Sequence, residues 1–130
     1  MLIGRPSNWY ETLSKFTSGV ELESVRAVSC KKRERNRFRP KAVRRADVVV
    51  TVTHPLIPIL QGCWLKPEVH INAIGAVGPN HRELDEVAFQ NATVVVESRE
   101  AVRREAGDIL LSNAPIHAEV GEDYRGKDHL

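Results

Sequence analysis

Cysteines and long apolar runs are scarce in this sequence of 130 residues. The two cysteines, Cys30 and Cys63, do not indicate a disulfide framework, so a reduced, cytoplasmic chain is the default expectation. No apolar segment approaches the roughly 18 residues that a membrane span requires. The N-terminus also lacks the basic and then apolar pattern of a secretory signal. These absences predict a cytoplasmic protein with no membrane partner.

Several motifs of familiar enzyme and metal-binding classes are missing as well. The two cysteines and five histidines show no spacing typical of metal ligands. Neither a P-loop nor a Gly-x-Ser-x-Gly nucleophile motif is present. The sequence therefore predicts no metal site, and it gives no support to P-loop or serine-hydrolase chemistry.

Two apolar runs are the main feature of what is present. Residues 48–52 and 69–74 are rich in valine and isoleucine, and the first run shows no alternation of apolar and polar positions. Such runs are typical of strands that are covered on both faces in a parallel sheet. The fold class that we predict is α/β, with about three to five parallel strands. Asn72 stands inside the second run, where we expect its amide to be hydrogen-bonded and to tie strands or the loop at Thr53 together.

The residues at the ends of these runs are the candidates for ligand binding. Thr53 and His54 end the first strand, and Ile74 and Gly75 end the second. In open α/β sheets, ligands bind beyond the carboxyl ends of the strands. We therefore expect these four residues to lie at a ligand site.

The rest of the C-terminal half alternates between helix and strand. We expect, in order, a loop with a short helix, a strand, a charged helix and an apolar segment, at residues 80–90, 93–97, 99–106 and 109–111. In the first helix, Leu84, Val87 and Ala88 share one face. Asp108 is expected to cap the turn that follows it.

The N-terminal part predicts a remnant of a first βαβ unit. Its expected strand, helix and second strand lie at residues 1–4, 9–16 and 25–28. The turn after the first strand reads Gly4-Arg5-Pro6-Ser7-Asn8, which leaves one glycine for close approach to a pyrophosphate. Pro6 also removes one amide donor.

Residues 31–45 form a basic run, with nine basic residues and one acidic residue. One interpretation is a nucleic-acid or nuclear-import patch, because Lys and Arg displace counterions from phosphates. A second is recognition of the 2′-phosphate of NADP. The third, which we favour, is a junction with no selected function. Phe38 is the one aromatic residue of the run, so base stacking has little support and nucleic acid is a poor candidate partner.

Several segments also match a known family in order along the chain. They are ADVVVTVTHPLIPILQGCWLKPEVHINAIG (46–75), RELD (82–85), VVVES (94–98), EAGDILLS (105–112) and AEVGE (118–122). Over residues 46–122, the sequence resembles the ornithine cyclodeaminase and mu-crystallin family of NAD(P)-dependent proteins. Within that family it looks closest to the mu-crystallin branch.

The resemblance implies a fold and a chemistry. It implies a partial Rossmann-like, doubly wound parallel sheet that binds NADPH or NADH through Thr53, His54, Ile74 and Gly75. It implies reduction of a cyclic imine (a ketimine), with thyroid-hormone binding as a linked property. Family members are homodimers, which adds a second copy of the chain as an implied partner.

Two further positions bear on the reaction. The cyclodeaminases place a catalytic aspartate where this sequence has Val77, and valine cannot move a proton, so the reductase interpretation is favoured. Glu105 matches a family glutamate near the ligand pocket, where it would hold the nitrogen of the substrate or hormone. The alternative for Glu105 is a solvated helix residue paired with arginine. No catalytic residue is assigned.

The family also implies a longer protein. Members add a second domain that supplies dimer contacts and part of the substrate pocket. We therefore expect a truncated chain: a degraded first unit with the basic junction (1–45), the C-terminal half of a nucleotide-binding domain (46–121) and a polar tail (122–130). On that expectation the reductase function is impaired. The alternative is a non-catalytic fragment of the fold with no enzyme activity.

Overall fold

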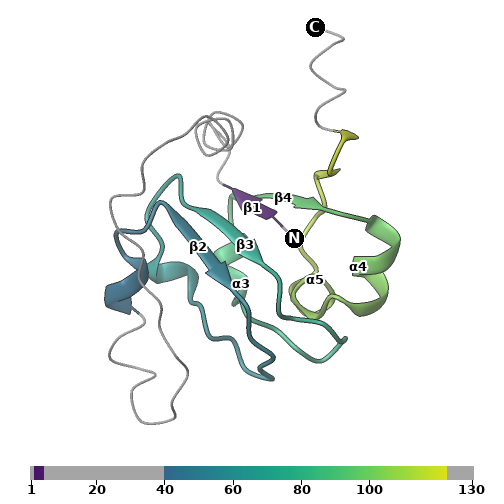
Figure 1. Cartoon of the computed structure of the whole chain (residues 1–130), viewed down its shortest axis with the longest axis horizontal. Coiled ribbons are helices and arrows are strands. Elements are labelled where there is room, and N and C mark those ends of the chain that lie inside the picture. Colours follow the sequence, from purple (N-terminus) through teal and green to yellow (C-terminus); the bar gives the residue numbers. More distant parts are fainter. Residues whose placement is uncertain (1, 5–39, 123–130) are drawn as a thin grey trace, which may run out of the picture.

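The computed structural model of the chain describes residues 2–4 and 40–122, which form one mixed sheet with short helices (Figure 1). In sheet order, the five strands are β2 (Val48–Thr51), β3 (His70–Ala73), β1 (Leu2–Gly4), β4 (Thr93–Val96) and β5 (Ala118–Glu119). The helices are η1 (Gly62–Trp64), α3 (Glu86–Phe89), α4 (Arg99–Glu105) and α5 (Gly107–Ser112). The expected elements at 9–16 and 25–28, most of the basic run and nearly all of the polar tail lie outside the described residues.

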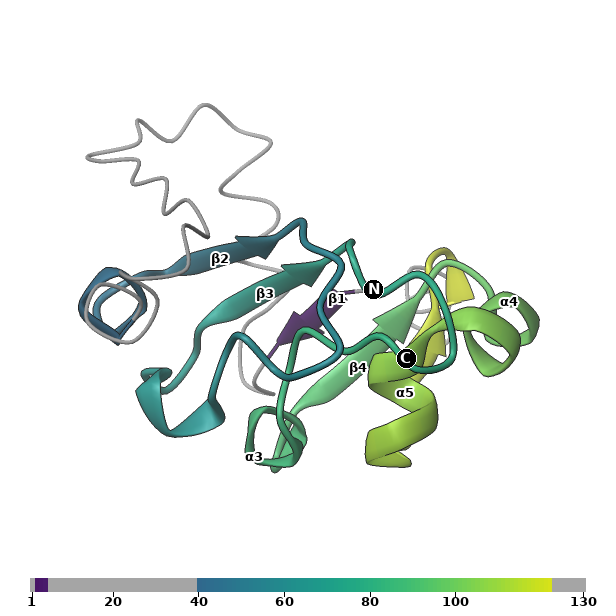
Figure 2. The same cartoon turned by 90° about the horizontal axis from the view of Figure 1, so that it is seen from below.

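Four of the five strands run in the same direction. β2 pairs with β3 in parallel, with Val49 opposite Ile71, and β4 pairs with β5 in parallel. β1 lies between β3 and β4 and is antiparallel to both, with Ile3 opposite Ile71 and Val94. Figure 2 shows β1 running between these two neighbours. The α/β class with a mainly parallel sheet is therefore confirmed.

The direction of β1 corrects one expectation. A strand forms at residues 2–4, close to the expected segment, but the first strand of a βαβ unit would run parallel to its neighbours. β1 instead fills the space between two parallel strands whose inner edges both need hydrogen-bond partners. An antiparallel strand satisfies those edges without a crossover connection.

The hydrophobic core lies on one side of the sheet. Side chains from three strands pack there against the loops and helices, and the core includes Val49, Ile71, Val94, Val96, Leu60, Leu84, Ala88, Val102 and Ile109. In Figure 2, α3 and α5 lie on this same side, below the sheet. Burial of these aliphatic groups is the main stabilising contribution, at about 25 cal/mol per Å² of apolar surface.

β2 differs from its expected burial. It is the outermost strand on its side of the described sheet, and its burial alternates along the chain. Val49 and Thr51 are buried, whereas Val50 is 55% exposed and Val52 is 68% exposed. The prediction of a strand covered on both faces is therefore wrong for β2. It holds for β3, in which His70, Ile71 and Ala73 are all buried.

Two of these helices, α3 and α4, begin at a side-chain cap. Asp85 caps α3, because its side chain accepts a hydrogen bond from the Ala88 backbone N–H. Leu84 and Ala88 are buried as expected, but Val87 is 39% exposed and does not share their face. Residues 109–111 form part of α5, with only Ile109 buried. Within the described residues, no helix has both the length and the apolar character needed to cross a membrane.

Candidate functional site

The carboxyl ends of β2 and β3 meet at a single buried carboxylate, that of Glu83. This side chain is fully buried although the chain has no regular structure around it. Oε1 accepts hydrogen bonds from the backbone N–H and the hydroxyl of Thr53, both at 2.6 Å. Oε2 accepts from the Thr51 hydroxyl at 2.7 Å and from the Gly75 N–H at 2.9 Å. Four donors thus compensate the desolvation of one carboxylate, which would otherwise be strongly unfavourable.

This carboxylate brings together residues that the sequence assigned to one ligand site. Thr53 and Gly75 share Glu83 as a partner, and the Ile74 N–H donates to the Thr51 carbonyl at 3.0 Å. The predicted cofactor edge is therefore a real cluster in space. The Thr53 N–H already donates to Glu83, so that amide is not free to bind a ligand.

The requirement for glycine at position 75 has a structural cause. A Cβ atom at this position would lie 1.9 Å from the Thr53 carbonyl oxygen and 2.6 Å from Glu83 Oε1. In the structure, the close approach is made by the backbone of the neighbouring strand end.

His54 lies on the exposed side of the same edge. Its ring stacks on that of His81, with centroids 3.5 Å apart and planes inclined by 21°. Its Nδ1 is 3.3 Å from the Gly75 carbonyl oxygen. Ile74 is 52% exposed and Val77 is 60% exposed. An apolar surface thus adjoins the polar cluster, which is the mixture that small-molecule sites present.

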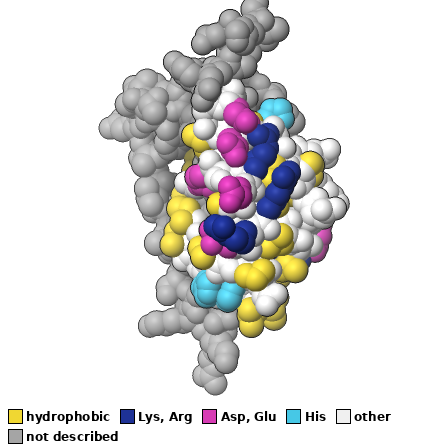
Figure 3. Space-filling view, turned by 90° about the vertical axis from the view of Figure 1, so that its right-hand side faces the viewer, with side chains coloured by type: hydrophobic (Ala, Val, Ile, Leu, Met, Phe, Trp, Pro, Cys, Tyr) yellow, Lys and Arg dark blue, Asp and Glu magenta, His cyan; other side chains and the backbone are white. Residues whose placement is uncertain are grey.

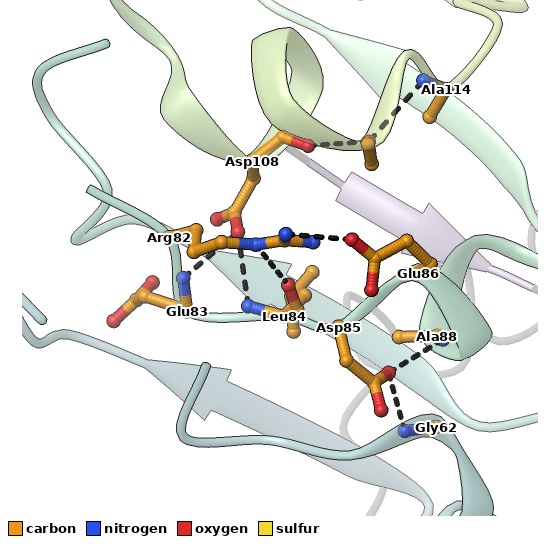
Figure 4. Close-up of polar contacts among 10 residues, drawn as sticks. Gly62, Arg82, Glu83, Leu84, Asp85, Glu86, Ala88, Asp108 and Ala114 are labelled. Atoms are coloured by element: carbon orange, nitrogen blue, oxygen red, sulfur yellow. Dashed lines mark hydrogen bonds and ion pairs between the residues drawn. The ribbon is translucent and has the colours of Figure 1, made fainter. Parts of the chain in front are cut away.

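A second buried acid supports the first. Asp108 is 1% exposed, and its Oδ1 accepts hydrogen bonds from the backbone N–H groups of Glu83 and Leu84 at 2.8 and 2.9 Å. Figure 4 shows its side chain pointing from α5 onto these two amides. The prediction that Asp108 caps its own turn is wrong, since α5 begins without a side-chain cap. Asp108 instead fixes the backbone on which Glu83 stands.

The two acids differ in how well their charges are compensated. Burial raises the pKa of Asp108 to about 6; the two backbone N–H bonds oppose this rise, and the nearby charge of Glu83 adds to it. Asp108 Oδ2 is also buried, with no hydrogen-bond partner among the described residues. Glu83, by contrast, has donors at both oxygens. Asp108 therefore takes up a proton more readily than an ordinary exposed aspartate.

The neighbouring loop residues are held by further polar contacts (Figure 4). Asp85 Oδ1 accepts from the Gly62 N–H at 2.8 Å and from the Ala88 N–H at 3.0 Å, which ties η1 to α3. Arg82 pairs with Glu86 at 2.7 Å. The charged residues at 82–86 therefore mainly make contacts within the fold, although their composition is typical of a surface segment.

Sequence reasoning did not identify Glu83, or the charged residues next to it, as site residues. The RELD segment contributed to the family resemblance, but nothing in its spacing marks the glutamate as buried. The one usable signal is the pair of strand-end threonines, whose hydroxyl donors need an acceptor. Asn72, which was expected to tie the Thr53 loop, is partly exposed, and Glu83 makes that connection instead.

Among the described hydrogen bonds, Glu105 makes none to the polar cluster around Glu83, whereas the Val77 N–H donates to the Gly75 carbonyl at 2.8 Å. The Glu105 side chain is exposed at the end of α4, and its backbone carbonyl accepts from the Gly78 N–H at 2.6 Å. Val77 forms a bridge with Ala106. A cavity of about 300 Å³ lies near α4 and α5, but Arg103, Ile109 and Asn113, not Glu105, are among its lining residues.

Charges are mixed on the face that α4 and α5 form. Figure 3 shows Lys and Arg side chains there beside Asp and Glu side chains, with hydrophobic side chains gathered near a histidine. Arg99 pairs with Glu122 at 2.6 Å, and Arg104 pairs with Glu100 at 4.0 Å. Within residues 2–4 and 40–122, no three His, Cys, Asp or Glu side chains converge as metal ligands.

Comparisons with known proteins give matches within one family. The family model described as "Ornithine cyclodeaminase/mu-crystallin family" matches residues 5–129. Ketimine reductase mu-crystallin of Rattus norvegicus is 46% identical over 116 residues, which are 89% of this chain and 34% of that protein. A Delta(1)-pyrroline-2-carboxylate reductase of Bacillus cereus is 40% identical over 95 residues, covering 67% of this chain and 29% of that protein.

A solved structure is also similar to this chain. The Thermococcus litoralis Delta(1)-pyrroline-2-carboxylate reductase, in complex with NADH and L-proline, superimposes with a TM-score of 0.63 at 32% identity. The match covers 68% of this chain and 30% of that one. The chain thus spans about a third of the length of the curated relatives it matches.

Proposed function

The chain belongs to the ornithine cyclodeaminase/mu-crystallin family, and from this premise we propose that it provides the nicotinamide-nucleotide site of an NAD(P)H-dependent cyclic-imine (ketimine) reductase. The observation that carries the proposal is the cluster at Thr53 and Gly75 around Glu83. It lies at the carboxyl ends of two parallel strands, where this class of fold binds nucleotides. NADPH is the first cofactor to test, and NADH is the second.

The exposed groups at this edge suit a nicotinamide. The face of Ile74, which is 52% exposed, offers apolar contact to a planar ring. Thr53, which is partly exposed, carries a hydroxyl for a polar contact beside it. The rings of His54 and His81 stack on each other at this edge. These residues would bind and orient the nucleotide.

The chain's own part in the reaction is binding and orientation. When bound, a reduced nicotinamide supplies the hydride that adds to the carbon of a C=N bond. Val77 cannot donate a proton at the place where cyclodeaminases carry an acid. We therefore propose a substrate whose imine nitrogen is already protonated, as in a cyclic iminium carboxylate.

A titration of the purified chain with NADPH tests this proposal. Ile74→Asp places a charge on the apolar contact, and we expect it to weaken binding at least about tenfold. Leu111→Asp is the matched control, because Leu111 is 46% exposed on α5, away from β2 and β3. Turnover of Delta(1)-pyrroline-2-carboxylate is then measured for the wild type. Equal effects of both variants, or a folded wild type that binds no nucleotide, would contradict the proposal.

Thyroid-hormone binding is proposed as a linked property, with Glu105 holding the amino nitrogen of the hormone. Glu105 is supported by its fixed backbone, since its carbonyl accepts from the Gly78 N–H. Glu105→Ala is expected to weaken hormone binding. Glu100→Ala, at an exposed glutamate on the same helix, serves as the control. Unchanged affinity in a folded Glu105→Ala variant would rule out this role.

Assembly as a homodimer is a further proposal, to be tested by sedimentation.

A further inference from the structure

We infer that Glu83 is a positioning residue that holds the Thr53 hydroxyl as a hydrogen-bond acceptor for an N–H or O–H donor on the nicotinamide half of the nucleotide. This inference rests on the proposed function, because it concerns the same edge of the sheet. It assigns a role to a residue that touches no ligand itself.

The donors around the Glu83 carboxylate determine the direction of the hydrogen bond from the Thr53 hydroxyl. Its carboxylate receives two backbone N–H groups, from Thr53 and Gly75, which can only donate. It also receives the hydroxyls of Thr51 and Thr53. Because the side chain is fully buried, loss of any of these donors leaves an uncompensated acceptor. The geometry therefore holds both threonine hydroxyls as donors toward Glu83.

The direction of that hydrogen bond determines what Thr53 can offer to a ligand. Thr53 has one hydroxyl hydrogen, and that hydrogen points to Glu83 Oε1 at an O–O distance of 2.6 Å. The remaining lone pairs of Oγ1 can only accept. The Thr53 N–H is also engaged by Glu83. Toward the open edge, Thr53 is thus an acceptor with no donor to offer.

The lone pairs of Thr53 Oγ1 match a ligand group that donates a hydrogen bond. A carboxamide N–H or a ribose O–H of the nicotinamide half can donate to Thr53. Phosphate and carboxylate oxygens cannot donate, and they would meet the lone pairs of Oγ1 with repulsion. By fixing the Thr53 hydroxyl as an acceptor, Glu83 allows the nicotinamide half of the nucleotide to bind next to Thr53. The same arrangement excludes the pyrophosphate from that position.

Thr51 provides a natural control within the same cluster. Its hydroxyl donates to the same carboxylate at 2.7 Å, but it is only 6% exposed. Thr53 is partly exposed at the strand end. Substituting either threonine removes one donor from Glu83. Only the substitution at Thr53 also removes the acceptor that faces a ligand.

The experiment measures dissociation constants for NADPH with Thr53→Val, Thr51→Val and Thr53→Ser, each checked for folding by circular dichroism. We expect Thr53→Val to weaken binding about tenfold, because a ligand donor is left without a partner. Thr53→Ser should stay within about twofold of the wild type, and Thr51→Val should weaken binding clearly less than Thr53→Val. The rescue by serine separates a hydroxyl effect from a loss of packing. Equal losses in both valine variants, no loss in Thr53→Val, or no rescue by serine would overturn the inference.

A second ligand distinguishes the two possible donors. The reduced 3-acetylpyridine analogue of NADP carries a methyl group in place of the carboxamide nitrogen, so it lacks that N–H. A Thr53→Val effect seen only with NADPH assigns the carboxamide, and an equal effect with both ligands assigns the ribose hydroxyl; both results support the inference. A folded wild type that binds neither ligand overturns the proposed function and this inference with it. Binding by the wild type with no difference between the valine variants overturns the inference alone.

Discussion

The carboxylate of Asp108 accepts a hydrogen bond from the backbone N–H of Glu83 at 2.8 Å, so one buried acid fixes the backbone of another. The two residues come from α5 and from the loop before α3, which are 25 positions apart in the sequence. Through Glu83, the contact extends to Thr53 and Gly75 at the strand ends. A short helix far along the chain thus contributes to the geometry of the proposed nucleotide edge.

The stability of the fold is expected to depend on pH through Asp108. Its pKa in the folded chain is raised from 3.8 to about 6, chiefly by burial. The folded chain therefore retains this proton at pH values where the unfolded chain has released it. The contribution of Asp108 to stability is greatest below about pH 4, falls as the pH rises to 6, and stays constant above that; the change is on the order of 3 kcal/mol.

Asp108→Asn should remove this dependence, because asparagine keeps one oxygen acceptor and does not titrate. The measurement is urea unfolding of both proteins between pH 4 and pH 7, with Glu100→Gln as a control at an exposed acid. The free energy of unfolding of the wild type relative to Asp108→Asn should decrease with rising pH. Parallel curves for the two proteins would show that Asp108 does not titrate in this range.

Gly75→Ala should destabilise the chain by more than about 3 kcal/mol, because the new methyl group overlaps backbone atoms that cannot move independently. The added methyl carbon would lie 1.9 Å from the Thr53 carbonyl oxygen. Asn80→Ala, in the exposed turn that follows, is the control and should change the free energy of unfolding by less than about 0.5 kcal/mol. Thermal unfolding gives both values. A well-folded Gly75→Ala protein would disprove the close contact.

Asp85→Ala should cost about 2 kcal/mol, since it removes both the cap of α3 and the link to Gly62. Ser98→Ala provides the comparison, because Ser98 caps α4 through one longer bond of 3.3 Å to the Ala101 N–H. That variant should cost less, about 0.5 to 1 kcal/mol. Urea unfolding of the two variants tests the order. Equal or reversed costs would show that the bond to Gly62 adds nothing.

The fold class and the grouping of Thr53 with Gly75 could be predicted from the sequence, for identifiable reasons. The valine and isoleucine runs determine β2 and β3, and ligand-binding edges lie at the ends of such strands. Thr53 and Gly75 therefore come together as expected. Whether they bind a nucleotide stays a prediction, as do the roles of His54, Ile74 and Glu105.

The rest depends on contacts between distant segments, which a single sequence does not reveal. Glu83 and Asp108 look like ordinary surface acids, and their burial follows only from where the loop and α5 meet. The exposure of Val50 follows from the position of β2 at the outside of the described sheet, which a hydrophobic run does not encode. The reversed direction of β1 has the same origin, since it depends on the two strands that flank it.

His70 should give the opposite pH dependence to Asp108. It is 6% exposed in β3, its Nδ1 has no hydrogen-bond partner among the described residues, and burial lowers its pKa below the ordinary value of 6.5. The folded chain therefore keeps His70 neutral at pH values where the unfolded chain protonates it. Its contribution to stability is complete above pH 6.5 and is lost as the pH falls below that value.

His70→Leu should therefore reduce the loss of stability on acidification, since leucine fills a similar volume and cannot bind a proton. Urea unfolding of this variant between pH 7 and pH 5 should show a shallower decline than the wild type. The double variant His70→Leu/Asp108→Asn should lose both contributions to the pH dependence of the free energy of unfolding. In the wild type the two groups act in opposite directions over overlapping pH ranges. If His70→Leu declines as steeply as the wild type, His70 is protonated within the fold, and its burial does not exclude the charge.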